Sequence, residues 1–125
     1  REVLLEEHRV MTGIADYSLV HFHPIALYAI EELVKIKSVS IIEVHRELMG
    51  PSIEEMLPSL KKIQEHKALL VSWCPGTPNK VPLETEIKYA LNHLSSEGLC
   101  LHFMAEDVEE GKSIMNLVKK ILKEV

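Results

Sequence analysis

The sequence from Ile41 to Trp73 is IIEVHRELMGPSIEEMLPSLKKIQEHKALLVSW, and its pattern decides the fold that we expect. Residues 41–48 and 52–63 each place apolar side chains at helical spacing. Between them, residues 49–51 are Met-Gly-Pro. Glycine tolerates positive φ, and proline suits the first turn of a new helix. The stretch therefore predicts two helices joined by a short turn.

The residues around the second helix complete a recognisable motif. Ser52 followed by Glu55 has the spacing of a capping box, which marks the start of a helix. Residues 68–73, ALLVSW, form a short apolar run that is typical of a strand. Residues 80–83 are expected to return as the second strand of a hairpin, with Pro82 at an edge where its missing N–H does no harm. The pattern predicts a helix-turn-helix followed by a wing.

Helices are predicted on both sides of this motif. Apolar residues recur at helical spacing in residues 2–16, 24–37 and 85–94, and in a last helix that runs from about residue 107 to residue 123. Residues 99–105 fit a strand or a buried helix equally well, because periodicity alone does not separate the two.

The fold class that follows is mainly α with a small β-hairpin. We expect one domain over residues 1–125, with a winged helix-turn-helix core at 24–96 and flanking helices in 1–23 and 97–125. The alternative is an all-α helical bundle, in which the segments 68–73 and 99–105 are helical.

Composition limits the classes of partner. The chain has 14 Lys and Arg against 19 Asp and Glu, so its net charge of −5 disfavours general coating of nucleic acid. No apolar run approaches the roughly 20 residues that a membrane span needs, so no membrane partner is expected. Two cysteines without metal-ligand spacing indicate a reducing compartment, and we expect a cytoplasmic protein.

Three segments of the motif resemble a known family. Residues 43–48, EVHREL, are similar to the pattern E-[LI]-A-x-x-L, and residues 56–63, MLPSLKKI, resemble L-Y-P-A-L-K-R-L, including Pro58 within the helix. Residues 78–86, PNKVPLETE, resemble the wing return P-x-K-x-Y-x-L-T-E. These patterns belong to winged-helix domains, and among them to the PadR family of transcription regulators. The resemblance covers about residues 24–96.

The resemblance implies a mode of DNA binding. A winged helix lays its second helix in the major groove, and Lys, Arg and backbone N–H groups contact phosphates. The acidic residues Glu54 and Glu55 at the start of that helix favour the alternative, a protein–protein interaction module. The DNA contacts that the resemblance implies are Ser52, Ser59, Lys61, Lys62, Lys67, Asn79 and Lys80.

The leading functional prediction is therefore a dimeric DNA-binding transcription regulator. The terminal helices are expected to form the homodimer, because terminal helices outside the motif commonly do so in winged-helix regulators. Two half-sites then multiply a weak single-module affinity for double-stranded DNA. No cofactor is needed for this role.

Metal binding and catalysis have little support in the residue spacing. The chain has seven histidines, of which His21 and His23 alternate as on a strand, and His93 lies one helical turn before Glu97. Neither pair supplies the three or four ligands of a metal site, so we expect surface or locally hydrogen-bonded histidines and no metal. The sequence has no glycine-rich phosphate loop or nucleophile motif, and Cys74 is expected to be an inert, partly buried thiol. The prediction is that the protein is not an enzyme.

Overall fold

The computed structural model of the protein describes residues 6, 7, 10, 14–47, 49–74 and 81–124. They form a four-stranded sheet in the order β1-β2-β3-β4, and every neighbouring pair is parallel. The strands are β1 (Leu19–Phe22), β2 (Ile41–Arg46), β3 (Ala68–Trp73) and β4 (Leu99–Phe103). The protein is therefore an α/β protein.

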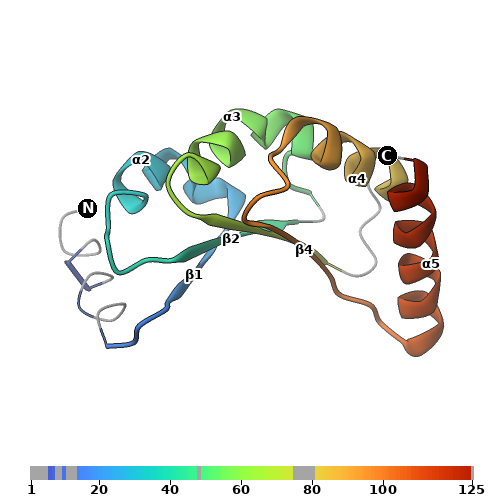
Figure 1. The fold of residues 1–125 in the computed structure, drawn as a ribbon, viewed down its shortest axis with the longest axis horizontal. Helices are drawn as coiled ribbons and strands as arrows, with labels where there is room; N and C mark the ends of the chain where they lie inside the picture. The colour runs from blue at the N-terminus through green and yellow to red at the C-terminus, as the bar shows by residue number, and fades with distance from the viewer. Residues whose placement is uncertain (1–5, 8–9, 11–13, 48, 75–80, 125) are drawn as a thin grey trace.

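A helical segment follows each strand. The 3₁₀ helix η1 (Pro24–Ala29) and the short α2 (Ile30–Leu33) come after β1, and α3 (Ile53–Gln64), α4 (Leu83–His93) and α5 (Val108–Glu124) come after the other three strands. Figure 1 shows α2, α3 and α4 along one side of the sheet, with α5 packed beside α4 at its end. Each strand is joined to the next strand of the sheet by a right-handed crossover, always in the same direction. All crossovers therefore lie on the same face, and the helices cover only that face.

Alternation of the side chains along the strands builds the core. In β2, Ile42, Val44 and Arg46 are buried under the helices, whereas the residues between them point to the opposite face. The helices cover that layer with apolar side chains such as Met56 and Leu60 of α3, which are almost completely buried. No described helix covers the other face of the sheet (Figure 1).

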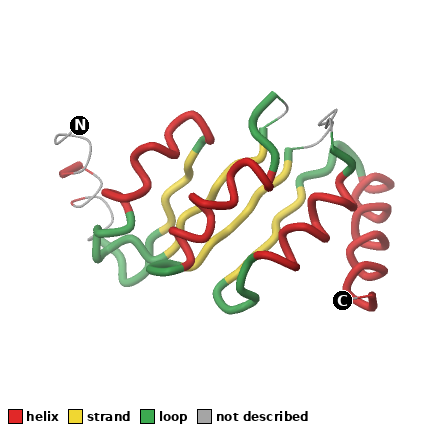
Figure 2. The backbone as a smooth tube through the Cα atoms, turned by 90° about the horizontal axis from the view of Figure 1, so that it is seen from above, coloured by secondary structure: helices red, strands yellow, loops and turns green. Residues whose placement is uncertain are grey.

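The sheet is wound in one direction only. Figure 2 shows the helices running beside the strands, each a step further along the sheet. This winding is the one found in βα-barrels, and it differs from doubly wound sheets, in which the strand order reverses. In such parallel folds the loops after the carboxyl ends of the strands carry the functional groups.

The predicted fold class is wrong. The structure has a parallel sheet in place of a small β-hairpin, and it is not the alternative all-α helical bundle. Residues 41–46, predicted to be helical, form the inner strand β2, because Ile41, Ile42 and Val44 are β-branched and alternate between two faces. The wing does not form among the described residues, since α4 begins at Leu83 where the returning strand was expected.

Three other local predictions are confirmed, and the remaining segments were left open, differ in part or are not described. Helix α3 begins at the predicted capping box, β3 is a strand, and α5 spans the expected last helix. Residues 99–103 are a strand. The helix predicted from residue 24 is a 3₁₀ helix that continues as one short α-helical segment. Most of the helix predicted at 2–16 lies outside the described residues.

Among the described residues, no helix combines the length and the apolar character needed to cross a bilayer.

Candidate metal centre

Three histidines converge at the carboxyl edge of β1 and β2. His21 lies in β1 and His45 in β2, and both point to the sheet face that no described helix covers. His23 follows β1 in an extended conformation (φ −88°, ψ 147°), so its side chain emerges on the same side as His21. One nitrogen from each ring lies within 4.8 Å of the others. Strand register thus assembles a three-nitrogen site from two separate segments.

Two carboxylates orient the first two rings. Glu43, the register partner of His21 on β2, accepts a hydrogen bond from His21 Nδ1 at 2.8 Å. Glu47, just after β2, accepts one from His23 Nδ1. A carboxylate can only accept hydrogen bonds, so each Nδ1 carries the proton and each Nε2 is left with a lone pair. Histidine ligands of metals are oriented in this way by carboxylates in their outer shell.

The Nε2 atoms of His21 and His23 lie close together. His21 Nε2 and His23 Nε2 are 3.2 Å apart. With both rings neutral, neither nitrogen has a proton to donate to the other, so an added positive charge is needed to make this contact favourable. Either an extra proton or a metal ion can supply that charge. Two imidazole nitrogens bound to one tetrahedral zinc ion are about 3.3 Å apart, given Zn–N bonds of about 2.0–2.1 Å.

His45 completes the set as a neutral ring. Burial lowers the pKa of His45, and a positive charge on His21 lowers it further whenever that ring is protonated. A lower pKa keeps the imidazole in the unprotonated form that binds metals. His45 is only partly buried, so an ion from solvent can reach it.

A polar row continues from the histidines across the open sheet face. Ser72 of β3 donates to Glu43 Oε1, and Ser72 Oγ lies 3.0 Å from His102 Nδ1 on β4. Although burial acts to raise the pKa of Glu43, hydrogen bonds from Ser72 and His21 hold that pKa below its usual value. Glu43 therefore stays ionised and anchors His21.

Cys74 lies beside this row. It follows β3, and its Sγ is 3.4 Å from His45 Nε2. Burial raises the pKa of the Cys74 thiol, and the Glu47 carboxylate raises it further. Neither Cys74 nor Cys100 is in a disulfide.

Five of the seven residues predicted to bind DNA are described, and they are spread from one end of α3 to the other. Ser52 caps α3 and accepts from the backbone N–H of Glu55 at 3.2 Å, whereas Lys67 follows the opposite end of that helix. The Lys67 ammonium donates to the Ile36 carbonyl at 2.8 Å, and burial lowers the pKa of this lysine. The predicted contacts Asn79 and Lys80 lie outside the described residues.

The remaining three predicted contacts lie on α3. Ser59 is partly buried, Lys61 is exposed, and Lys62 forms an exposed ion pair with Glu65 at 3.2 Å. Among the described residues, helix α3 packs between α2 and α4 over the sheet and follows a strand, so it is not the second helix of a helix-turn-helix, the arrangement on which these contacts depended (Figure 2). DNA binding stays a prediction.

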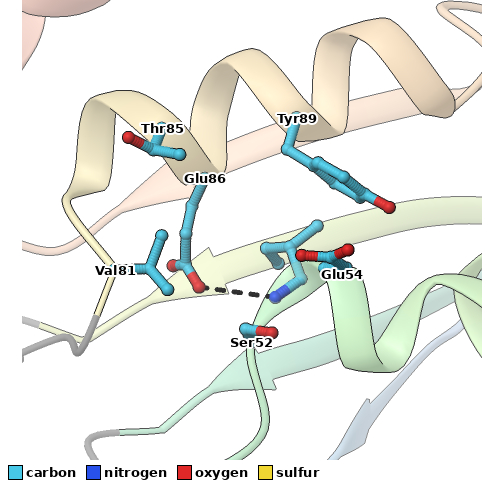
Figure 3. A pocket seen from close by; sticks show the side chains of 7 residues that line it. Ser52, Glu54, Val81, Thr85, Glu86 and Tyr89 are labelled. Carbon is cyan, nitrogen blue, oxygen red and sulfur yellow. Dashed lines mark hydrogen bonds between the residues drawn. The ribbon is translucent and has the colours of Figure 1, made fainter.

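Two hollows lie away from the histidines. A cavity of about 40 Å³ lies between α3 and α4, and the buried Glu86 there accepts from the backbone N–H of Ile53 at 3.4 Å. Figure 3 shows the side chains that line it. Tyr89 and Glu54 line its mouth, and it has room for a few water molecules only. A shallow hollow of about 510 Å³ lies at the amino edge of the strands, opposite to the edge that carries sites in parallel folds.

Sequence reasoning noticed His21 and His23 but missed their partner. His45 was assigned to a helix, which separated it from the other two histidines. The signal that could have found it is the pair of matching alternations, His-x-His at 21–23 and Glu-x-His-x-Glu at 43–47. Placed on neighbouring parallel strands, these alternations bring ligands and carboxylates to one face.

Comparison with known proteins adds no relative to this description. No family model, no curated protein and no solved structure matches the chain.

Proposed function

We propose that the protein binds a divalent transition metal ion, zinc foremost, through His21, His23 and His45. The observation that carries the proposal is the 3.2 Å approach of His21 Nε2 and His23 Nε2 while both Nδ1 atoms are committed to carboxylates. An extra proton would satisfy that pair without any third group. A metal ion would also use His45, whose neutral ring lies within 4.8 Å of the other two, and this third nitrogen favours a metal ion over a proton.

The charges around the rings favour a dication. Glu43 and Glu47 contribute two carboxylates within hydrogen-bond distance of the histidines, and the three rings are neutral when they act as ligands. Imidazole ligands suit zinc, copper, iron and nickel better than magnesium or calcium, which prefer oxygen. Zinc fits best because it prefers tetrahedral coordination, and two nitrogens on a tetrahedral ion have about the spacing of the two Nε2 atoms.

Three histidine ligands suit a catalytic metal centre. Such a centre holds its ion with three protein groups and leaves one position for water or substrate, and the bound ion acts as a Lewis acid and lowers the pKa of that water. The chain's own contribution is to fix the rings through Glu43 and Glu47. It also presents the site at the carboxyl edge of the strands, on a face that a small substrate can approach. Metal-assisted hydrolysis is the reaction class that we propose.

Zinc titration of the metal-free protein by isothermal calorimetry tests the metal centre. One equivalent is expected to bind the parent protein, and the His21→Ala and His23→Ala variants are expected to lose that binding. His66→Ala is the matched control, because His66 is exposed and lies after α3 at the other edge of the sheet. The proposal fails if the parent protein binds no zinc, or if His66→Ala weakens binding as much as His21→Ala.

Self-association remains a separate proposal, and α5 is its best candidate surface. Val108, Met115 and Leu122 are all more than half exposed and follow one another at seven-residue intervals along one side of this helix. We infer that two copies pair through this stripe. Light scattering at micromolar concentration tests it: a dimeric mass that becomes monomeric in Met115→Glu is expected, and a monomeric parent protein removes the proposal.

A further inference from the structure

The thiol of Cys74 belongs to the same edge of the sheet as the three histidines. Cys74 follows β3 directly, and its backbone N–H reaches the Arg46 carbonyl of β2 at 3.5 Å, so the ladder between the two strands extends to this residue. Cys74 is two residues after Ser72, so its side chain lies on the same face of the sheet as Ser72, the face that no described helix covers. The side chain is partly buried, and Sγ lies 3.4 Å from Nε2 and 3.8 Å from Nδ1 of His45.

The distance to His45 matches that of two ligands on one ion. A zinc ion with a Zn–N bond of about 2.05 Å and a Zn–S bond of about 2.3 Å holds the two ligand atoms about 3.5 Å apart at the tetrahedral angle. Cys74 Sγ and His45 Nε2 are 3.4 Å apart. On the other side of the site, His21 Nε2 and His23 Nε2 are spaced as a second such pair. The four donors thus form two pairs with tetrahedral spacing, and a bound ion would have to draw the pairs together, because the three histidine nitrogens alone lie within 4.8 Å of one another, wider than about 3.3 Å in a bound set.

We propose that Cys74 is the fourth protein ligand of the metal centre and closes it in the resting state. This inference rests on the proposed function, because it needs the ion that His21, His23 and His45 hold. In the step that closes the centre, the Sγ–H bond breaks, its proton passes to solvent, a metal–sulfur bond forms and the metal-bound water leaves. The metal keeps its oxidation state, and no electron is transferred.

A thiolate in the fourth position controls access to the ion. A metal site with four protein ligands is closed to water and substrate, whereas a site with three keeps an open position. Loss of the sulfur ligand converts the first kind into the second. Cys74 therefore acts as a removable cap, and the three histidines hold the ion with or without it.

Cobalt replaces zinc in the test because its spectrum distinguishes the ligands. Tetrahedral Co²⁺ gives visible absorption bands whichever nitrogen or sulfur atoms bind it, and a cobalt–thiolate bond adds a charge-transfer band in the near ultraviolet. Titration of the metal-free protein with Co²⁺ is expected to produce both. The charge-transfer band is expected to disappear in Cys74→Ser, while the visible bands shift but remain.

The matched control is Cys100→Ser. Cys100 is an exposed cysteine of β4 on the same face of the sheet, and β3 lies between its strand and the histidines of β1 and β2. This variant is expected to keep the charge-transfer band. Visible cobalt bands without charge transfer in the parent protein overturn this inference and leave the proposed function intact. No cobalt spectrum at all overturns the metal centre itself, and the inference with it.

Alkylation of the parent protein provides a test that needs no variant. Iodoacetamide is added with and without one equivalent of zinc, and mass spectrometry of peptides reports the rate at each cysteine. Zinc is expected to protect Cys74 and leave the rate at Cys100 unchanged. Equal rates at Cys74 with and without bound zinc overturn the inference even if Cys74→Ser does not fold.

Discussion

The Nε atom of Arg46 donates a hydrogen bond to Glu86 Oε1 at 3.0 Å, and both side chains are almost completely buried. The other carboxylate oxygen of Glu86 accepts from the Trp73 indole N–H, also at 3.0 Å. Arg46 makes further hydrogen bonds to the carbonyls of Glu47 and Gly50. One buried ion pair thus joins β2, β3 and α4 directly behind the histidines.

Removing the charge of Glu86 is expected to destabilise the protein strongly. Glu86→Gln removes the carboxylate that pairs with the buried Arg46 guanidinium, and breaking a buried pair in this way costs about 3–5 kcal/mol. Urea unfolding followed by circular dichroism measures the loss. Glu97→Gln, at an exposed carboxylate in the turn before β4, is the control and is expected to leave the urea midpoint unchanged. Equal midpoints for the two variants would contradict the role assigned to the pair.

Glu43 is expected to tune the metal centre without binding the ion. Glu43→Gln replaces the acceptor that fixes the proton of His21 on Nδ1, and losses of this kind weaken metal affinity about 10–100-fold. Competition between the protein and a chelator for zinc measures the change. Glu54→Gln, at an exposed carboxylate of α3, is the control. Unchanged zinc affinity in Glu43→Gln would show that the carboxylate does not orient a metal ligand.

The sequence predicts helices better than it predicts the sheet, for a physical reason. Helix α3 can be predicted from local residues, because Ser52 and Glu55 form a capping box and the helix has a full apolar stripe. A strand of a parallel sheet depends on neighbours distant in the chain. Residues 41–46 contain apolar positions that suit either a helix face or a strand, and only pairing with β1 and β3 decides between them.

The candidate site could not be predicted from the sequence for the same reason. Each of its histidines, considered alone, resembles an ordinary surface histidine. They become a site when β1 and β2 lie parallel with His21 opposite Glu43, since that register places His45 near His23 as well. The three histidines can therefore be read from the sequence, but that they lie close together can be predicted only once the order and register of the strands are known.

Loss of the α3 cap is expected to cost a modest and measurable amount of stability. Ser52→Ala removes the oxygen that accepts from the Glu55 backbone N–H, and substitutions of this kind cost about 1 kcal/mol. Urea unfolding measures the effect, and Ser52→Asp, which restores an acceptor, is expected to recover most of it. A Ser52→Ala variant as stable as the parent protein would contradict the cap.

Gly98 is expected to resist substitution because of its backbone and not because of crowding. It has a φ of 69° in the turn before β4, and a Cβ built there would meet the Ala68 Cα at 3.6 Å, an ordinary contact distance. Gly98→Ala should therefore cost only the conformational penalty of a left-handed residue, about 1–2 kcal/mol. Gly98→Asn should cost less, because asparagine tolerates this region. Urea midpoints in the order glycine, asparagine, alanine are expected. Equal losses in the two variants would indicate crowding against β3, and no loss in either would mean that the turn does not require a positive φ.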